Sequence, residues 1–501
     1  MADNTSKDAA EAIAELIEGV DSDFHAPEIE GAVTTEETRG PRAMGFNVEE
    51  INEDHALVII GSKAIVIKEQ FNGPVRDRIR FLSPDAFFAW FANRPTETVG
   101  QDGKIRITTW GRRWFTHRDR RQFDGIEFFP NPDGVEGTAR YLDLWHGFGM
   151  EPKADGTYDV FRDHLLTNVC GADPKLFDWV FGWFAHIVQR PRERLGTALV
   201  LRGRQGVGKS KIGEVFGSLF PAHYCQIDNP RYVTGQFNAH MASCLLLHAD
   251  EAVWAGDKTA EGRLKGLVTA ETQMIESKGI DAIQIKNYVR LMMTSNETWV
   301  VPAGMDERRF CVLDVNDRCA QDHDYFCEMM DELDRGGRAR LLHDLLHFNF
   351  DKIDLRKVPN TDALFEQKLH SLESVDSWWY SRLIEGTPAR GVNTWPTQIA
   401  AAALYADYVH AAEQVGTRRK RDPGTFGLTL KKLAPNIERV RRRAEASPGD
   451  GKRVYSYVLP ALTACRDVFS AMLGHQIDWP PLSDAEIEPV GAQADDEIVP
   501  L

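Results

Sequence analysis

Residues 203–210 constrain the fold of this chain more than any other segment, because they read Gly-Arg-Gln-Gly-Val-Gly-Lys-Ser and complete the pattern G-x-x-x-x-G-K-[ST]. The apolar run over residues 197–201 has the composition of a buried strand, and residues 211–220 carry apolar side chains at helical spacing. This order of strand, glycine-rich loop and helix predicts a loop that binds the phosphates of a nucleotide. The alternative is a glycine-rich turn that binds no nucleotide.

Phosphate binding explains why the loop needs these residue types. Glycines let backbone N–H groups approach phosphate oxygens, and the amino end of the helix adds its positive dipole end. We expect Lys209 to reach the β and γ phosphates and Ser210 to offer its hydroxyl to Mg²⁺. The expected cofactors are therefore ATP and Mg²⁺. The residues expected to contact the nucleotide are Gly203, Gln205, Gly206, Val207, Gly208, Lys209 and Ser210.

A second apolar run, residues 244–249, ends in the acidic pair Asp250 and Glu251. It predicts a buried strand that delivers two carboxylates to its carboxyl end, where open α/β sheets bind their ligands. We expect Asp250 to hold Mg²⁺ through its water shell, together with Ser210. Glu251 is expected to polarise the attacking water.

Polar residues also flank two further predicted strands, residues 289–295 and 310–315. Asn296 follows the first, where it could orient the attacking water or sense the γ-phosphate; a turn-forming asparagine is the alternative. Arg308 and Arg309 precede the second, where ring-shaped ATPases place an arginine that reaches the γ-phosphate bound by a neighbouring subunit. We expect the two arginines to act jointly, the alternative being a solvated surface.

The order of these motifs resembles the superfamily 3 helicases of viruses and phages, in particular the helicase module of phage primase-helicase and primase-polymerase proteins. The resemblance covers roughly residues 140–320. It implies an α/β fold with a P-loop AAA+ ATPase core, a homo-hexameric ring, and ATP-driven movement along single-stranded DNA at a replication fork. The implied partners are single-stranded and forked DNA and a separately encoded primase or polymerase. The segments that carry the resemblance are residues 203–209, 235–238, 249–258, 275–279 and 299–303.

Family members carry a loop or hairpin that projects into the ring channel and grips DNA phosphates. In this chain residues 275–286 alternate between apolar and polar types, with Gly279 available for a turn. The resemblance implies that Lys278 and Lys286 contact DNA. Ordinary surface charge is the alternative, and Lys286 could equally face the nucleotide or an adjacent subunit.

Charge and cysteine usage bound the class of protein. The net charge is −16, but residues 1–40 hold 11 acids against 2 bases and residues 481–501 hold 6 acids and no base, so the body between them is nearly neutral. The acidic composition therefore does not argue against nucleic acid as a partner. The 7 cysteines are widely spaced, which speaks against disulfides and structural zinc. With no signal peptide and no apolar run near ~18 residues, we expect a cytoplasmic protein with no membrane partner.

Composition shifts divide the chain into six segments. We predict an acidic disordered arm, an α+β N-terminal domain, a helical bundle, the ATPase, a winged-helix-like domain and an acidic tail. Their respective bounds are residues 1–42, 43–150, 151–195, 196–385, 394–470 and 481–501.

The winged-helix prediction rests on the order helix, helix, hairpin near the C-terminus. Helices are predicted over residues 396–415 and 423–433, and a hairpin pairs residues 439–443 with 453–458. Basic residues flank the second helix on both sides, which favours docking on duplex DNA through phosphates. A basic protein-interaction domain is the alternative. The expected DNA contacts are Arg418, Arg419, Arg441 and Arg442.

Three other segments allow two interpretations each. The basic aromatic residues 110–115 could stack on a single strand or pack in a core. An apolar stripe within residues 158–194 could serve ring assembly or a buried core. Residues 495–501 resemble the partner-docking tail of bacterial single-strand binding proteins, or they merely keep the chain soluble.

The motifs together predict an ATP-dependent DNA helicase of phage replication. One alternative is a replication or origin-binding protein that does not unwind DNA and uses ATP only to switch its assembly. The other is a P-loop kinase, although a kinase would want an arginine lid and a nucleoside pocket in place of Asn296, Arg308 and Arg309.

Overall fold

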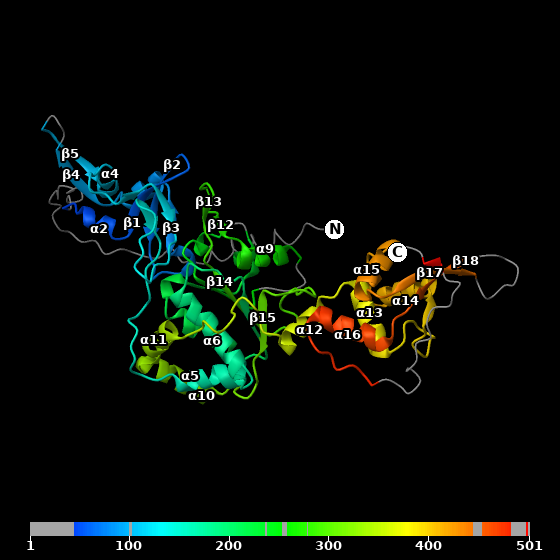
Figure 1. The fold of residues 1–501 in the computed structure, drawn as a ribbon. Helices are drawn as coiled ribbons and strands as arrows, with labels where there is room; N and C mark the ends of the chain where they lie inside the picture. The colour runs from blue at the N-terminus through cyan, green and yellow to red at the C-terminus, as the bar shows by residue number, and fades with distance from the viewer. Residues whose placement is uncertain are drawn as a thin grey trace, which may run out of the picture.

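The computed structural model describes residues 45–99, 103–235, 238–252, 258–277, 279–443, 453–481 and 497–498. An N-terminal, a central and a C-terminal group of elements follow one another across the molecule (Figure 1). Within the described ranges, no helix has both the length and the apolar character needed to cross a membrane. The predicted acidic arm, residues 1–42, lies outside the described residues.

A parallel sheet forms the central group, and the described residues contribute five strands to it in the order β10-β11-β14-β9-β15. Four of these strands are runs of mostly buried side chains, as expected of a parallel sheet that is covered on both faces. They match the four strands predicted from the sequence. Their bounds are Ala198–Arg202 for β9, Leu246–Asp250 for β11, Arg290–Ser295 for β14 and Phe310–Asp314 for β15.

The edge strand β10 (Tyr224–Ile227) was not predicted. Its four residues alternate between buried and more exposed positions, a pattern too short to identify a strand without its partner. Pairing with β11 makes it a strand. The helices around the sheet are α7 (Lys209–Gly217), η3 (Pro221–His223), α8 (Pro230–Thr234), η4 (Ala239–Met241) and α9 (Lys258–Thr269).

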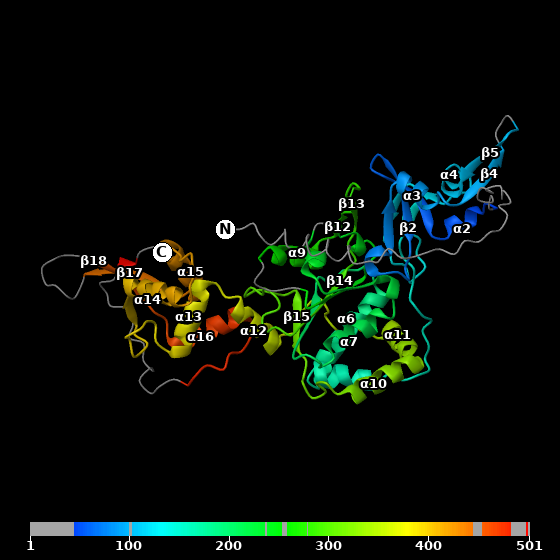
Figure 2. The ribbon, with the colours of Figure 1, turned by 180° about the vertical axis from the view of Figure 1, so that it is seen from behind.

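Hairpin β12–β13 rises from the central group, as the alternation around Gly279 predicts. Its strands are Thr272–Ile275 and Ile283–Lys286, paired antiparallel, and Gly279 has a φ of +82°. Lys286 pairs with Thr272 at the base of the hairpin, away from its tip. The helices formed by residues 159–189 and 323–347, the helical group, lie on the opposite side of the sheet from the hairpin in both views (Figures 1 and 2).

The helical group buries the apolar stripe that sequence analysis considered for ring assembly. Side chains along α6 (Pro174–Gln189) are at most 8% exposed from Phe177 to Val188, apart from Asp178. Phe184 stacks on Phe216 of α7 at a ring-centroid distance of 3.4 Å. The stripe is therefore core of this chain, and the ring-assembly interpretation is wrong. The other members are α5 (Asp159–Asp163), η2 (His164–Val169), α10 (His323–Glu332), η5 (Leu333–Gly337) and α11 (Arg338–His347).

The N-terminal group is a small sheet, in the order β3-β2-β1-β6, with apolar residues on both faces. One face packs with α3 and α4 in a separate core, and the other joins the central core. Trp110 and Trp114 are 3% and 0% exposed, so they pack in the core and offer no surface for stacking bases. The bounds are α2 Val48–Asn52, β1 His55–Ile60, β2 Lys63–Glu69, η1 Val75–Asp77, β3 Ile79–Leu82, α3 Pro84–Trp90, β4 Pro95–Val99, β5 Ile105–Thr109, α4 Trp110–Phe115, β6 Gln122–Phe123, β7 Gly125–Glu127 and β8 Tyr141–Asp143.

The C-terminal group has a hydrophobic core of its own. It contains the two helices and the hairpin predicted from the sequence, and β16 adds to the hairpin in the order β16-β18-β17. Helix α12 joins the two cores, because Leu364 packs in the central core while Phe365 and Leu369 pack against the C-terminal one. The bounds are α12 Asp362–His370, α13 Ser374–Glu385, β16 Gln398–Ala400, α14 Ala401–Gln414, α15 Pro423–Leu433, β17 Glu438–Arg443, β18 Arg453–Val458, α16 Leu462–Leu473 and β19 Glu497–Ile498.

Candidate functional site

The carboxyl ends of three neighbouring parallel strands bring the predicted site residues together. Asp250, at the end of β11, is in register with Thr294 of β14, which is in register with Leu201 of β9. The glycine-rich loop leaves β9 at this same edge and enters α7 at Lys209. Since ligands of open α/β sheets bind outside the carboxyl ends of the strands, this edge is the candidate site.

The loop has a backbone that only glycine adopts readily. Gly203, Gly206 and Gly208 have φ values of +152°, +84° and +90°. A Cβ at Gly208 would also lie 2.7 Å from the ring of Phe326 and 2.8 Å from Nε2 of His164. The glycines therefore satisfy both the turn geometry and the close packing of this loop.

Lys209 is 6% exposed and lies across the mouth of the loop. Its Nζ donates to the backbone oxygens of Gly203 and Arg204 and to Oδ1 of Asn296, each at 2.8 Å. Burial lowers the pKa of Lys209, against the opposing effect of the Glu251 and Asp250 carboxylates. The predicted association of Asn296 with the loop is thus a direct hydrogen bond.

Asp250 accepts hydrogen bonds from three side chains. The hydroxyls of Ser210 and Thr294 donate to its Oδ1 at 2.9 Å and 2.5 Å, and Nε2 of Gln226 donates to its Oδ2 at 3.1 Å. Burial raises the pKa of Asp250, but the hydrogen bonds from Thr294 and Ser210 outweigh it and leave the pKa below its ordinary value. The carboxyl group is therefore charged at neutral pH.

Glu251 follows Asp250 in a left-handed backbone conformation, with a φ of +54°. Such strain in a non-glycine residue costs about 1–3 kcal/mol and clusters at functional sites. The backbone N–H of Asn296 donates to Glu251 Oε2 at 3.1 Å, and the hydroxyl of Ser295 donates to the same oxygen at 3.4 Å. The carboxylate stays exposed at the edge of the sheet, within reach of a ligand.

The arginines predicted to act on a neighbouring subunit lie at the amino end of β15. Arg309 forms an ion pair with the nearly buried Glu307 at 3.0 Å. Arg308 is exposed, and its side chain has no hydrogen bond or ion pair within the described residues. Because β9 and β15 are parallel neighbours, these arginines and the glycine-rich loop lie at opposite edges of the sheet.

The predicted DNA contacts are scattered over two groups of elements. Lys286 is exposed at the base of hairpin β12–β13, and Lys278 lies outside the described residues. Arg418 and Arg419 are exposed in the turn between α14 and α15. The remaining two lie on β17, where Arg441 is exposed with its guanidinium 5.7 Å from the ring of Tyr455, and the side chain of Arg442 lies outside the described part.

Sequence analysis missed the residues that hold Asp250. Thr294 lies on a predicted strand, but only the register with β11 shows that its hydroxyl reaches Asp250. Gln226 lies on the strand that was not predicted. His248, a histidine inside the apolar run before Asp250, was a sequence signal of a buried polar contact. In the structure His248 is 0% exposed and forms a hydrogen bond with Thr294.

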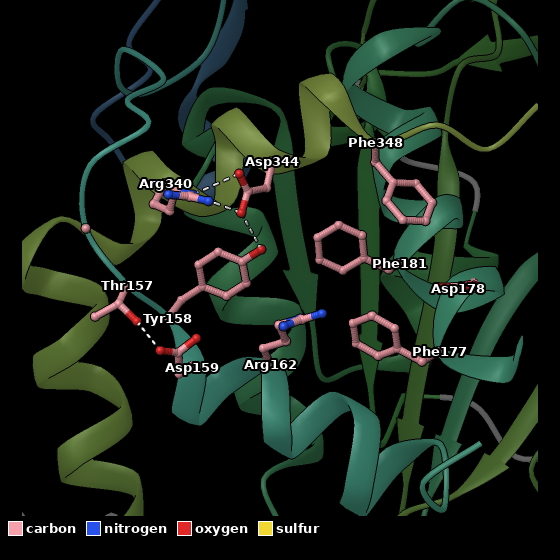
Figure 3. A pocket seen from close by; sticks show the side chains of 11 residues that line it. Thr157, Tyr158, Asp159, Arg162, Phe177, Asp178, Phe181, Arg340, Asp344 and Phe348 are labelled. Atoms are coloured by element: carbon pink, nitrogen blue, oxygen red, sulfur yellow. Dashed lines mark hydrogen bonds and ion pairs between the residues drawn. The ribbon is translucent and has the colours of Figure 1, made fainter. Parts of the chain in front are cut away.

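A separate pocket of about 530 Å³ lies in the helical group (Figure 3). Its polar groups largely satisfy one another, since the Tyr158 hydroxyl donates to Asp344 at 2.9 Å and Arg340 donates to the same carboxylate at 2.8 Å. No residue predicted to bind nucleotide or DNA lines it. Across the ranges that the structure covers, no cluster of three or more His, Cys, Asp or Glu side chains could hold a metal ion.

Comparison with known proteins gives one family match and one similar phage protein. Residues 201–309, which include the glycine-rich loop and the acidic pair, match a family described as "Family of unknown function (DUF5906)". The chain is 28% identical over 219 residues to the "DNA Primase-polymerase" of Nitratiruptor phage NrS-1. This match covers 43% of the chain and 29% of the relative, so the chain spans less than a third of the relative's length.

Solved structures show the same fold over most of the chain. "The apo structure of NrS-1 C terminal region (305-718)" matches with a TM-score of 0.57 at 16% identity, covering 82% of this chain and 98% of that one. "The A form apo structure of NrS-1 C terminal region-CTR" matches with the same TM-score, identity and coverage. At this identity the likeness shows the fold alone.

Proposed function

We propose that this chain is an ATP-dependent DNA helicase of phage replication, built on a P-loop AAA+ core of the superfamily 3 type. One observation carries the proposal: Lys209, Ser210, Asp250, Glu251 and Asn296 meet at one edge of the sheet through direct hydrogen bonds. The similarity to a phage primase-polymerase supports a role in DNA replication.

The residues at the edge divide the work of hydrolysis. Lys209 exchanges its hydrogen bonds to Gly203, Arg204 and Asn296 for phosphate oxygens, helped by the amino end of α7. Glu251, exposed at this edge, accepts a proton from the attacking water, and the Asn296 side chain orients that water or senses the γ-phosphate. These roles need no side chain from elsewhere in the described part of the subunit.

The donor set fits Mg²⁺. A carboxylate and a hydroxyl, Asp250 and Ser210, lie side by side, and Mg²⁺ takes its remaining oxygen ligands from substrate phosphates and water. Bound Mg²⁺ neutralises charge that develops on the phosphates. Asp250, through bound water, and Ser210, through its hydroxyl oxygen, would hold the ion.

The arginine positions support a ring. A strand of five residues separates Arg308 from the nucleotide edge of its own subunit, which corresponds to about 16 Å at ~3.3 Å per residue. Arg308 therefore serves the site of a neighbouring copy, and a closed homo-hexamer supplies such a neighbour to every site. Arg309, which is paired with Glu307, holds this corner in place.

DNA contacts are proposed at two places. Hairpin β12–β13, with Lys278 and Lys286, contacts single-stranded DNA in the ring channel. The C-terminal group, which we propose is winged-helix-like, contacts duplex DNA through Arg418, Arg419, Arg441 and Arg442. Its order of helices and hairpin supports this proposal.

Substitutions at the loop test the proposal. Lys209→Ala is expected to abolish ATP hydrolysis and weaken ATP binding, whereas Glu251→Gln keeps binding and loses turnover by at least about a hundredfold. Both variants should fail to displace a strand from forked DNA. Lys211→Ala is the matched control, because Lys211 lies on the same helix in a half-exposed ion pair with Glu214. Wild-type turnover in Lys209→Ala or Glu251→Gln would overturn the assignment.

Two other functions remain as outcomes of the same assays. DNA-stimulated hydrolysis without strand displacement would favour an ATP-switched replication or origin-binding protein. Phosphate transfer to an acceptor instead of water would favour a P-loop kinase.

A further inference from the structure

A directed chain of hydrogen bonds runs through the sheet and ends on Asp250. The Thr294 hydroxyl gives its only proton to Asp250 Oδ1, so its oxygen accepts from Nε2–H of His248 at 2.9 Å. A neutral imidazole that donates from Nε2 accepts at Nδ1, and the Tyr224 hydroxyl donates there at 2.7 Å. Three neighbouring strands, β10, β11 and β14, each supply a member.

The central members of this hydrogen-bonded chain of side chains are buried and closely packed. His248 and Thr294 are 0% and 1% exposed. A Cβ at Gly213 would lie 2.5 Å from His248 Nδ1, so helix α7 rests directly on the imidazole. A polar ring at the centre of a sheet is costly unless both nitrogens are hydrogen-bonded, and both are.

We infer that His248 is a positioning residue for Asp250. The Nε2–H group of His248 donates to the hydroxyl oxygen of Thr294. This hydrogen bond restricts rotation of the hydroxyl, so the Thr294 proton points at the Asp250 carboxylate. The Oδ1 atom of Asp250 is thereby held beside the Ser210 hydroxyl. In this position the carboxylate would accept hydrogen bonds from water bound to Mg²⁺. Tyr224 fixes the tautomer that makes this possible. The inference rests on the proposed function, since it assigns Asp250 and Ser210 to the metal.

Isosteric substitutions separate positioning from packing. Thr294→Val keeps the shape and removes the hydroxyl, while Thr294→Ser keeps the hydroxyl. His248→Gln keeps a donor, whereas His248→Leu keeps only bulk. Tyr224→Phe removes one O–H at the far end of the chain. The readout is ATP affinity measured by calorimetry on the full chain, in Mg²⁺ and again in EDTA.

We expect Thr294→Val and His248→Leu to weaken ATP binding in Mg²⁺ by about tenfold, because Asp250 loses its fixed orientation beside Ser210, and to leave binding in EDTA unchanged. Thr294→Ser and His248→Gln should recover most of the Mg²⁺-dependent affinity. Tyr224→Phe should show the same selectivity with a smaller loss. Thermal midpoints report whether each variant is folded, and Thr294→Val carries the test if His248→Leu does not fold.

The inference is overturned if Thr294→Val weakens ATP binding equally in Mg²⁺ and EDTA, or leaves binding unchanged in both buffers. The hydrogen-bonded side chains would then contribute packing alone. It is also overturned if Thr294→Ser is as defective as Thr294→Val. A wild-type protein that binds no ATP in either buffer would overturn the proposed function itself. The two failures are therefore distinct.

Discussion

The contacts that each residue makes at the ends of the central strands indicate which role that residue can have. Arg308 and Arg309 illustrate this, because adjacent positions in the sequence have different surroundings. The Arg309 guanidinium contacts both oxygens of Glu307, whose side chain is 2% exposed. Arg308 points to solvent from the same turn. The pair predicted to act jointly therefore divides into Arg309, which is ion-paired within the chain, and Arg308, which is exposed.

Single substitutions of these arginines should have different effects. Arg309→Ala is expected to lower stability by about 1–3 kcal/mol, because it leaves the Glu307 carboxylate buried without its cation. Arg308→Ala should keep the thermal midpoint and lose at least about tenfold in ATP hydrolysis.

Mixing Arg308→Ala with Lys209→Ala subunits should restore part of the hydrolysis at mixed interfaces. Turnover that never exceeds the sum of the separate variants would place Arg308 in its own subunit. An unchanged midpoint in Arg309→Ala would show that the ion pair adds nothing to stability.

At the scale of elements, the half of hairpin β12–β13 nearer its turn is fastened to two other segments. Asn238 donates to the backbone oxygen of Met274 and accepts from the backbone N–H of Glu276, both at 2.8 Å. Towards its tip, Asp281 accepts from Lys63 of the N-terminal group at 3.1 Å. The hairpin proposed to contact DNA is therefore linked to the N-terminal group, whose role was open from sequence.

The acidic C-terminal segment pairs with an edge of the C-terminal group. Strand β19 adds antiparallel to β17, with Glu497 in register with Arg441 and Ile498 in register with Val440. If β17 contacts duplex DNA as proposed, this segment competes with DNA for a basic strand. Deleting residues 495–501 is expected to raise duplex affinity about threefold to tenfold at low salt, with the gain fading as salt rises.

A fluorescence-anisotropy titration with duplex DNA checks this result. Ile498→Pro is the matched variant, since it keeps every charge but interrupts strand pairing. Gain in the deletion alone would indicate general charge repulsion and no competition through pairing. If neither variant binds duplex DNA more tightly, the segment does not influence DNA binding.

At the scale of the whole molecule, several imidazoles are buried in the core. Burial lowers the pKa of His164 and His248 to about 4 and of His186 and His223 to about 3, from an ordinary value of 6.5. Unfolding therefore takes up protons between pH 6.5 and 4. The stability that these neutral rings contribute is fully present above pH 6.5 and is lost as the pH falls towards 4.

The thermal midpoint is accordingly expected to fall by at least roughly 5 °C between pH 7 and pH 5. His223→Gln should flatten this dependence, although it loses the stacking of His223 on Trp145 and so melts lower at pH 7. Scanning calorimetry of the two proteins across this range is the measurement. Equal slopes for both would show that His223 does not titrate as its burial requires.

Local sequence patterns predicted much of the candidate site. The glycine-rich loop is a local pattern, because its three left-handed backbones are accessible only to glycine at low cost. Four central strands are also readable locally, since strands buried on both faces appear as continuous apolar runs. Lys209, Asp250 and Asn296 could be placed together because carboxyl ends of parallel strands share one edge.

Tertiary structure alone decided which surfaces those patterns meet. The apolar stripe of α6 and the tryptophans of α4 look alike whether they face a core or a partner, and only packing against other elements buries them. The support of Asp250 by His248 and Thr294 depends on the register between strands about 40 residues apart, which side-chain periodicity within either strand does not encode. Periodicity is a property of one strand; register is a property of two strands packed side by side.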